Sequence, residues 1–426
     1  MNQWPTISIE NVVERLIDYR GKTPEKTTSG IKLITAKVIK DGRILEENHE
    51  YIASDNYDSW MRRGLPQQHD ILITTEAPLG EVAQLRTSEK IALAQRVILL
   101  RGNPALIDQD FFFQALKAPF MQAGLKARAT GTTVAGIKQS ELRKVDVPLP
   151  PLPTQRKIAA ILSAYDDLIE NNTRRVRVLE DMARALYREW FVEYRYPGHE
   201  LVVFVEDEQG RRPKGWKLAS ISDVAPLVTR GIAPKYNEDS LSLVINQKCI
   251  RDQRLSLQPA RRHLGKVPVM KQVGFGDVLI NSTGIGTLGR VAQVYEELTD
   301  CTVDSHVTIV RPDLDKVDLD FFGLALLNMQ SHFEGLGVGA TGQTELGRER
   351  VSSTHLLRPD LALQNDFGER VRPLRGAVVN LERRNTNLRR TRDLLLPRLV
   401  SGELDVSNLD IRGAAKDMVT EAEAVA

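Results

Sequence analysis

The stretch LPPLPTQRKIAAILSAYDDLIENNTRRVRVLEDMARALYREWF, from Leu149 to Phe191, decides the fold of this chain. Its prolines cannot continue a helix, and Thr154 is placed to cap the helix that follows. Apolar residues then recur at alternating spacings of four and three, which is the pattern of a coiled-coil seam. The seam comprises Ile158, Leu162, Tyr165, Ile169, Asn172, Val176, Leu179, Ala183, Leu186 and Trp190. A helix of about 36 residues spans roughly 55 Å, so we expect a long helix that needs a partner helix.

The same stripe returns about 209 positions later, which places a partner helix in the same chain. Its members are Phe367, Val371, Leu374, Val378, Leu381, Asn385, Leu388, Arg392, Leu395 and Leu399. Asn385 lies close to the position of Asn172, and a single amide in such a seam can fix its register. Pro373 and Gly376 are expected to break or delay the first turns. Pro397 is expected to end the helix near Leu396, so Ala377–Leu396 is predicted to be its better part.

The repeat extends beyond the helices. Four short motifs recur in the same order: Arg20-Gly21-x-x-Pro24 as Arg230-Gly231-x-x-Pro234, Leu79-Gly80-x-Val82-Ala83-Gln84 as Leu288-Gly289-x-Val291-Ala292-Gln293, Asp110-Phe111-Phe112 as Asp320-Phe321-Phe322, and Ala129-Thr130-Gly131 as Ala340-Thr341-Gly342. An internal repeat decides architecture. The chain is therefore predicted to hold two copies of one unit, a mixed domain followed by a helix, related by an approximate twofold axis.

Composition limits the classes of protein. The chain has 426 residues, a hydrophobic content of 42% and a net charge of +2, which allows two or three packed domains. No apolar run reaches the roughly 18 residues of a membrane span, and the first residues lack the pattern of a signal peptide. The two cysteines, Cys249 and Cys301, exclude a disulfide framework and favour a cytoplasmic protein. A net charge near zero does not indicate nucleic-acid binding, although a basic face is compatible with it.

The predicted fold class is α+β, with two mixed α/β domains in a pseudo-twofold repeat, separated by two long antiparallel coiled-coil helices. The expected segments are 1–152 (first domain), 153–195 (central helix), 196–214 (linker), 215–358 (second domain), 359–402 (C-terminal helix) and 403–426 (flexible tail). In the first domain IKLITAKVIK and IALAQRVILLRG are each predicted to form one strand. DQDFFFQALKAPFMQAGLKA is predicted to form one helix, and DILITTEAPLGEVAQL two strands around a turn at Ala77-Pro78.

Two motifs resemble catalytic or cofactor sites. Gly284-Ile285-Gly286-Thr287-Leu288-Gly289 matches the dinucleotide pattern GxGxxG, but that site needs a helix after the glycines. The following RVAQVYEE alternates like a strand, so a glycine turn is the preferred interpretation. Asp304-Ser305-His306 could indicate nucleophilic catalysis, but neighbouring strand residues point to opposite faces, which favours a polar strand edge. The histidines show no zinc spacing. We therefore expect no metal, no cofactor and no catalytic residue in this chain.

The loop-to-helix stretch PLPPLPTQRKIAAIL, the helix end LYREWF and the late stretch RRTRDLLLPRLVSGEL resemble the specificity subunit of type I restriction-modification systems. This resemblance covers nearly the whole chain. It implies a non-catalytic subunit that binds double-stranded DNA, each domain reading one half of a bipartite site. It also implies that the helices set the spacing and dock two methyltransferase subunits, to which restriction/translocase subunits are added. S-adenosylmethionine, ATP and Mg belong to those partners. The second helix start, RPDLALQNDFGER, departs from PPLPTQRKIAAIL.

Candidate DNA contacts are residues that suit phosphate or base recognition. They are Arg20, Lys22, Thr23 and Lys26 in the first loop, Arg230, Lys235 and Tyr236 in its counterpart, Thr74, Thr75, Asn281, Ser282 and Thr283 at strand ends, and the basic Arg261 and Arg262. For each group a solvated or structural role is the alternative. Tyr187, Trp190 and Phe191 are candidates for methyltransferase docking, or they close the helix seam internally. The alternative function is a coiled-coil scaffold without sequence-specific DNA binding; a nucleotide-dependent enzyme using the glycine motif is a further rival.

Overall fold

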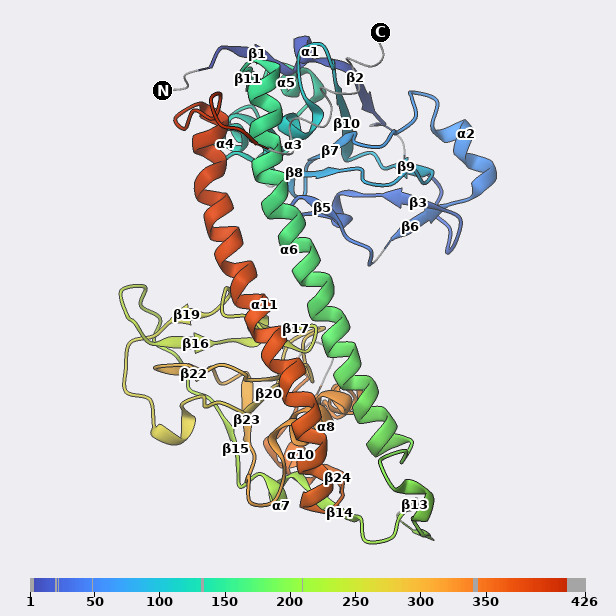
Figure 1. The fold of residues 1–426 in the computed structure, drawn as a ribbon, viewed down its shortest axis with the longest axis vertical. Helices are drawn as coiled ribbons and strands as arrows, with labels where there is room; N and C mark the ends of the chain where they lie inside the picture. The colour runs from blue at the N-terminus through green and yellow to red at the C-terminus, as the bar shows by residue number, and fades with distance from the viewer. Residues whose placement is uncertain are drawn as a thin grey trace. The chain divides into compact units, whose positions relative to one another are not determined.

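The computed structural model describes residues 4–19, 21, 23–47, 49–131, 134–208, 210–339 and 344–411, and the chain divides into two compact units (Figure 1). Unit 1 comprises Met1–Asn171 and Asn385–Ala426, and unit 2 comprises Asn172–Arg384. Each unit is described below by itself. The coarse prediction of a mixed α and β protein with a long central helix is confirmed.

Two long helices contribute to both units. Helix α6 spans Leu152–Tyr187 and continues into a π-helical stretch at Arg188–Val192. The predicted cap at Thr154 is wrong, because the helix begins at Leu152 and Thr154 is already inside its first turn. Thr154 and Gln155 both donate their backbone N–H groups to the Pro151 carbonyl, at 2.8 and 3.0 Å. Pro153 is tolerated there because the N–H groups of a first helical turn have no partner in the helix.

Helix α11 spans Leu361–Ser401 without interruption, so the predicted breaks at Pro373 and Gly376 and the predicted end before Pro397 are wrong. Pro373 and Gly376 lie on the exposed side of the helix. Water can therefore satisfy the carbonyl that loses its donor at a proline. The opposite side, with Phe367, is buried and holds the helix in place.

Unit 1 is built on a four-stranded antiparallel sheet of order β2-β10-β7-β8 and a three-stranded sheet of order β6-β3-β9. Two-stranded pairs β1-β11 and β4-β5 complete its strands. The strands are β1 (Thr6–Ser8), β2 (Val13–Asp18), β3 (Ile31–Ile34), β4 (Ile39–Lys40), β5 (Arg43–Ile44), β6 (Glu50–Ile52), β7 (Ile71–Thr75), β8 (Leu79–Gln84), β9 (Ile91–Leu93), β10 (Val97–Gly102) and β11 (Asp146–Pro148). Its shorter helices are α1 (Ile9–Val12), α2 (Tyr57–Trp60), α3 (Gln109–Lys117), α4 (Pro119–Ala127) and α5 (Gln139–Leu142).

Unit 2 has a four-stranded antiparallel sheet of order β15-β23-β20-β21 and a three-stranded sheet of order β19-β16-β22. Its pairs are β12-β13, β14-β24 and β17-β18. The strands are β12 (Phe204–Asp207), β13 (Gly210–Pro213), β14 (Lys217–Ser220), β15 (Leu227–Arg230), β16 (Leu243–Ile245), β17 (Ile250–Arg251), β18 (Arg254–Leu255), β19 (Arg261–Arg262), β20 (Val278–Asn281), β21 (Val291–Gln293), β22 (Cys301–Val303), β23 (Val307–Arg311) and β24 (His355–Arg358). Its shorter helices are α7 (Ile221–Val224), α8 (Leu319–Asn328), α9 (Gln330–Gly335) and α10 (Arg348–Ser353).

Several predicted elements are divided in the structure. The run IALAQRVILLRG forms two strands, β9 and β10, because the chain turns at Gln95 and Arg96 between them. The run predicted as one helix forms α3 and α4, because Ala118 is extended before Pro119, as proline requires of its preceding residue. The run IKLITAKVIK holds β3, a 3₁₀ turn and β4. The two strands predicted around Ala77-Pro78 are confirmed as β7 and β8.

The long helices belong to the hydrophobic cores of the units. In unit 1 Ile158 and Leu162 of α6 and Leu399 of α11 share one buried cluster with the phenylalanines of α3. In unit 2 Phe367 and Val371 of α11 share a cluster with the residues of α8. Seam residues are therefore buried against sheet-covering helices as well as against each other.

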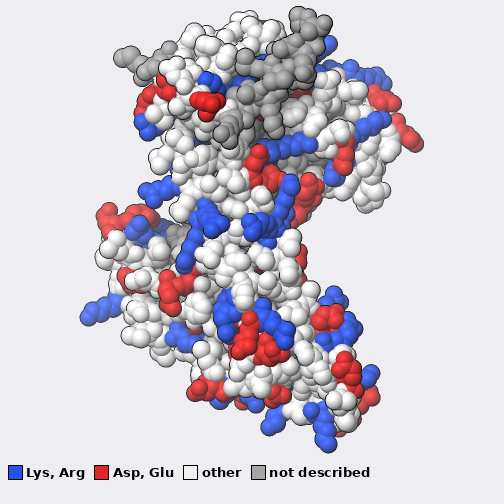
Figure 2. Space-filling view, viewed as in Figure 1, with Lys and Arg blue, Asp and Glu red and all other residues white. Residues whose placement is uncertain are grey.

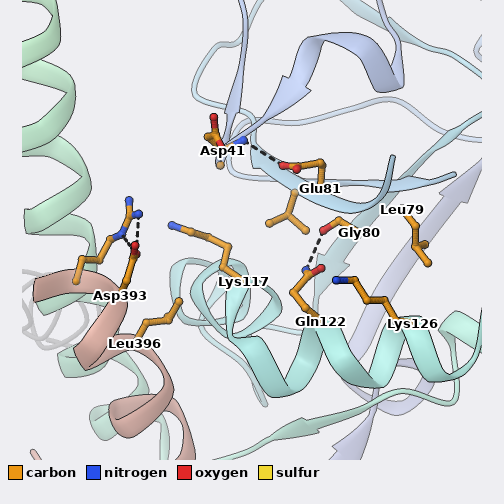
Figure 3. A pocket seen from close by; sticks show the side chains of 12 residues that line it. Asp41, Leu79, Gly80, Glu81, Lys117, Gln122, Lys126, Asp393 and Leu396 are labelled. Atoms are coloured by element: carbon orange, nitrogen blue, oxygen red, sulfur yellow. Dashed lines mark hydrogen bonds and ion pairs between the residues drawn. The ribbon is translucent and has the colours of Figure 1, made fainter. Parts of the chain in front are cut away.

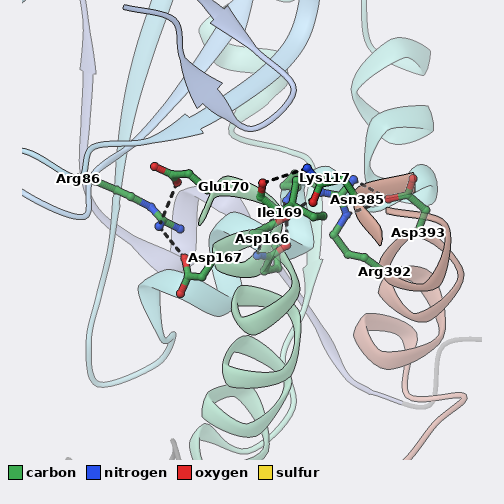
Figure 4. Close-up of polar contacts among 10 residues, drawn as sticks. Arg86, Lys117, Asp166, Asp167, Ile169, Glu170, Asn385, Arg392 and Asp393 are labelled. Atoms are coloured by element: carbon green, nitrogen blue, oxygen red, sulfur yellow. Dashed lines mark hydrogen bonds and ion pairs between the residues drawn. The ribbon is translucent and has the colours of Figure 1, made fainter. Parts of the chain in front are cut away.

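Within unit 1 the beginning of α6 and the end of α11 run side by side in opposite directions (Figure 1). Asn385 lies in this seam, buried, and its amide donates to the Ile169 carbonyl at 3.4 Å. Asp166 lies between Lys117 Nζ, at 2.9 Å, and Arg392 Nη1, at 2.7 Å (Figure 4). Such polar contacts in an apolar seam specify one register.

Candidate nucleic-acid interface

The first predicted DNA-binding loop follows β2. Arg20 and Lys22 lie outside the described residues. Thr23 is exposed, and its hydroxyl contacts Gln95 Oε1 at 3.4 Å. Lys26 forms an ion pair with Glu50 at 2.8 Å while half of its side chain stays exposed. The Glu50 side chain is only 26% exposed and the oxygen that Lys26 contacts is buried, so a phosphate would have to compete with Glu50 for this ammonium group.

The residues predicted at strand ends are mostly buried, which corrects their assignment as DNA contacts. Thr74, Thr75, Asn281 and Ser282 are at most 2% exposed. Thr74 accepts from the Glu81 N–H at 3.0 Å, and Asn281 donates to the Gln247 carbonyl at 3.0 Å. These side chains fix the turns and leave no surface for DNA.

Thr283 differs from Asn281 and Ser282 because it is partly exposed. Its hydroxyl lies 2.8 Å from His306 Nδ1 and 3.2 Å from Gln247 Oε1. The three polar side chains form one small hydrogen-bonded group at the end of β20. Hydroxyl, imidazole and amide groups can each bond to a phosphate or a base edge.

Arg230, at the end of β15, is engaged within the unit. Its guanidinium forms an ion pair with Glu345 and donates to the Leu346 carbonyl at 2.8 Å. The structure thus gives Arg230 a structural role at the loop before α10. A DNA phosphate would have to compete with Glu345 for it.

The residues at β19 form an exposed basic surface, here called the β19 platform: Lys235, Tyr236, Arg261 and Arg262. The guanidinium carbon of Arg261 lies 3.5 Å from the centre of the Tyr236 ring. Arg262 is held by the Ser240 carbonyl, at 2.6 Å from its Nη1. A cation over an exposed aromatic ring can contact phosphates and stack on bases.

His263 anchors this platform and was not singled out from the sequence. It is buried, and its Nδ1 accepts from the Lys235 N–H at 2.9 Å. The only sequence signal is its place directly after the two arginines. Tyr236 also forms a β-bridge with His263, the residue directly after β19, so the buried imidazole helps to hold the Lys235–Tyr236 segment beside this strand.

The two motifs that resemble cofactor and catalytic sites form turns. Gly284, Gly286 and Gly289 have φ of +105°, +70° and +80°, values that favour glycine. Strand β21 follows them, as predicted, so the helix that a dinucleotide site requires is replaced by a strand. Asp304-Ser305-His306 lies between β22 and β23, which corrects the predicted strand edge to a turn. The backbone N–H of His306 donates to the Asp304 carboxylate at 2.9 Å. The His306 ring is hydrogen-bonded to the Thr283 hydroxyl and not to Ser305. Among the described residues, His306 is therefore not placed as a base for Ser305.

A sequence model described as "Type I restriction modification DNA specificity domain" matches residues 2–181. The MjaIX specificity subunit of Methanocaldococcus jannaschii is 25% identical over 348 residues, covering 80% of this chain and 78% of that protein. The MjaVIII specificity subunit of the same organism is 20% identical and covers 96% of this chain and 94% of that protein. The chain belongs to the specificity subunits of type I restriction-modification systems. The S subunit of M. genitalium has the same fold, with a TM-score of 0.59, 18% identity, and coverage of 94% of this chain and 96% of that one.

As a specificity subunit, the chain is the non-catalytic DNA-recognition component of its system. The predicted family is confirmed, and the alternative of a scaffold without DNA recognition finds no support among these relatives. The described residues include no group of three or more side chains placed to hold a metal ion, and no described helix is both long and apolar enough to cross a bilayer.

Of the three aromatic residues predicted to dock a partner of the specificity subunit, Trp190 and Phe191 are core residues and Tyr187 is partly buried against them. Trp190 and Phe191 are 4% and 6% exposed. Phe191 lies 4.8 Å from Phe321 and 4.9 Å from Phe367, centre to centre, and Tyr187 lies 6.1 Å from each of those two rings. Burial raises the pKa of Tyr187. These three side chains close the seam of unit 2 internally, which corrects the docking assignment.

The surface charge of the specificity subunit is mixed. Figure 2 shows basic and acidic side chains interspersed on the face that it draws. This agrees with the net charge of +2. A surface of mixed charge produces no strong long-range attraction for DNA, so DNA contacts must come from local groups such as the β19 platform.

Proposed function

We propose that each unit carries one target-recognition domain, so that the subunit reads a bipartite DNA site, one half per unit. The observation that carries this proposal is the repeated sheet topology: β2-β10-β7-β8 in unit 1 and β15-β23-β20-β21 in unit 2 have the same strand order and pairing. A three-stranded sheet with one parallel pair accompanies each of them. Two equivalent readers in one chain suit a target made of two half-sites.

The proposal further assigns the long helices α6 and α11 to spacing and docking. As an antiparallel coiled coil related by a pseudo-twofold axis, they would hold the two readers at a fixed separation and offer equivalent surfaces to two methyltransferase subunits. Restriction/translocase subunits then join that core. S-adenosylmethionine, ATP and Mg bind to those partner subunits. The specificity subunit contributes only the recognition of the DNA sequence.

In unit 2 we assign DNA contact to the β19 platform, and above all to Tyr236 and Arg261. Both are exposed, and their stacked arrangement is formed before DNA arrives, so little side-chain entropy is lost on binding. Thr283 is a further candidate. In unit 1 the corresponding candidates are Thr23, Lys26, Arg20 and Lys22.

The test is binding of the assembled methyltransferase complex to duplexes in which one half-site is randomised at a time. The variant Tyr236→Ala is expected to weaken binding to the intact target about tenfold, the usual effect of losing one stacking aromatic. It is also expected to lose discrimination at one half-site and keep it at the other. Equal loss at both halves, or full discrimination by the variant, contradicts the assignment. Leu201→Ala, which removes an exposed apolar side chain of unit 2 outside the β19 platform, is the control.

A further inference from the structure

One end of the four-stranded sheet of unit 1 gathers polar residues from three neighbouring strands. The loop with Thr23 follows the end of β2. Because β10 pairs antiparallel with β2, Arg96, which directly precedes β10, lies at this same end of the sheet. Glu76 directly follows β7, which pairs with β10 on its other side. The contact of Thr23 with Gln95, at 3.4 Å, places the predicted DNA-binding loop beside Arg96.

Glu76 and Arg96 form an ion pair at this end of the sheet, and both side chains stay accessible. Arg96 Nε lies 2.7 Å from Glu76 Oε1, the arginine side chain is 50% exposed and the glutamate side chain is 39% exposed. An accessible pair of this kind contributes little to stability. A guanidinium carries five N–H donors and a carboxylate accepts at two oxygens, so the pair can bind a further ligand while its members stay in contact.

The turn that carries Glu76 is held by contacts within unit 1. Glu76 forms a β-bridge with Gly136. At the start of β8, Gln122 Nε2 donates to the Gly80 carbonyl at 2.8 Å, at the wall of a pocket of this unit (Figure 3). The ion pair is therefore presented on a turn that is already ordered, so little conformational entropy is lost when it meets a ligand.

Unit 2 has a different pair of side chains in the equivalent place. Thr283 follows β20 and His306 precedes β23, and these strands have the same places in their sheet as β7 and β10. The residue before Glu76 donates its backbone N–H to the Arg96 carbonyl at 3.0 Å. The residue before Thr283 donates to the His306 carbonyl in the same way, at 2.8 Å. An ion pair in unit 1 thus takes the place of a hydroxyl–imidazole pair in unit 2, which suits two domains that recognise different sequences.

The ligand of the Glu76–Arg96 pair has to offer a hydrogen-bond donor as well as acceptors. A DNA phosphate offers acceptors only, and Glu76 would repel its charge. The major-groove edge of a G·C base pair offers both, because guanine O6 and N7 accept from an arginine and cytosine N4 donates to a carboxylate. Thymine has O4 as its acceptor and a methyl group beside it, so a T·A pair lacks the second acceptor for the guanidinium.

We propose that Glu76 and Arg96 recognise one G·C base pair in the major groove, with Arg96 on the guanine and Glu76 on the cytosine. The proposal rests on the proposed function, because it places this base pair in the half-site that unit 1 reads. The two residues determine specificity by direct contact with the bases. Thr283 and His306 offer no guanidinium and no carboxylate, so unit 2 does not share this preference.

The test is binding of the assembled methyltransferase complex to duplexes in which each base pair of the parent target is replaced in turn. Arg96→Ala and Glu76→Gln are each expected to reduce discrimination at the same G·C pair by at least about fivefold. Discrimination at all other positions, including the other half-site, is expected to stay as in the parent. Arg86→Ala is the matched control and is expected to keep the parent discrimination everywhere. Arg86 is also 50% exposed, pairs with Asp167 at 2.8 Å, and follows β8 at the opposite end of the sheet.

A guanine analogue with a carbon atom in place of N7 tests the contact at the level of one atom. At the identified G·C pair, this analogue is expected to weaken binding of the parent complex about threefold or more. It is expected to weaken binding of the Arg96→Ala complex no further, because the donor that meets N7 is already absent. An equal effect of the analogue on both complexes would show that Arg96 does not contact this guanine.

Unchanged discrimination in both variants, or a reduction at an A·T pair or at two different base pairs, overturns the proposal. A uniform loss of affinity at every position also overturns it, because the ion pair then only supports the loop. Should Arg96→Ala fail to fold, Arg96→Lys keeps the charge but lacks the planar fork of donors, and is expected to reduce discrimination at the same pair. A parent complex that reads no split target contradicts the proposed function and this proposal together. Full discrimination by the variants within a split target contradicts this proposal alone.

Discussion

Gln364 occupies in unit 2 the place that Gln155 occupies in unit 1. Each is fully buried in the first turn of its long helix. Gln155 Oε1 accepts from the backbone N–H of Asp108 at 2.8 Å, and Gln364 Oε1 accepts from that of Asp318 at 3.1 Å. Asp108 and Asp318 in turn cap α3 and α8. One amide thus joins each long helix to the capped helix of its own unit.

The first prediction concerns Gln155, whose Nε2 also donates to the carbonyls of Pro150 and Leu106, at 2.8 and 3.0 Å. Gln155→Ala leaves one buried donor and two buried acceptors without partners. We expect it to lower the free energy of unfolding of unit 1 by roughly 2–4 kcal/mol, measured by hydrogen exchange with mass spectrometry. Gln68→Ala, on an exposed side chain of unit 1, is the control and should change its stability little. A stability equal to that of the parent would mean that the amide does not hold the helix start.

A second prediction uses two adjacent aspartates of α6 (Figure 4). Asp166 is mostly buried between Lys117 and Arg392, whereas Asp167 is exposed and pairs with the exposed Arg86 at 2.8 Å. Asp166→Asn leaves two partly buried cations without a carboxylate and should cost roughly 2–4 kcal/mol. Asp167→Asn should cost about 0–1 kcal/mol. Urea unfolding measures the loss in free energy of unfolding for each variant. An equal loss in the two variants would contradict the structure.

The third prediction concerns pH. Burial acts to raise the pKa of Asp166, but the charge of Lys117 and hydrogen bonds from Gln114, Lys117 and Arg392 outweigh it and lower that pKa from 3.8 to about 2. Because this pKa is depressed in the folded state, the stabilisation is present above pH 3.8 and is lost as the pH falls toward 2. In Asp166→Asn the stability of unit 1 should depend less on pH over that interval.

The fourth prediction concerns Asp320 in unit 2, whose pKa is shifted in the opposite direction to that of Asp166. Burial raises its pKa from 3.8 to about 6, against the charge of Arg375. Its Oδ2 has no hydrogen-bond donor among the described residues, and Arg372 Nε lies 3.6 Å away. The folded state therefore holds the proton more tightly, so this contribution to stability is largest below pH 3.8 and decreases as the pH rises through 6. Hydrogen exchange of unit 2 across this range should show the decrease in the parent and less of it in Asp320→Asn; the same slope in both would refute the assignment.

A fifth prediction tests the β19 platform by salt. If Arg261 neutralises a phosphate, Arg261→Gln should reduce the slope of log affinity against log salt by about one unit. Arg251→Gln, an exposed arginine of β17, should leave the slope unchanged. Fluorescence anisotropy with a labelled target duplex measures both slopes. An unchanged slope in Arg261→Gln would place the platform away from the DNA backbone.

The sequence predicted the seam because apolar periodicity is a local signal. Ile158, Leu162, Ile169 and Val176 are buried as expected, and Asn385 lies in the seam. The sequence did not predict that α11 continues through Pro373 and Pro397, because the burial that outweighs a proline is a property of the packed unit.

The candidate site was predicted less well, for a related reason. Thr74, Asn281 and Ser282 were predicted as DNA contacts only because their side chains are polar. Whether a polar side chain at a strand end points into the protein or toward solvent depends on hydrogen-bond partners elsewhere in the chain. Trp190 and Phe191 likewise matched the composition of an interface but meet Phe321 and Phe367.

The most direct test is a map of every methylated base in the DNA of cells that express this chain with its methyltransferase subunit. The account predicts a split sequence with two defined ends and a non-specific gap, and predicts that exchanging residues 4–147 for those of a relative changes one end only. A continuous methylated sequence, or a change of both ends on that exchange, would contradict the assignment of one half-site to each unit.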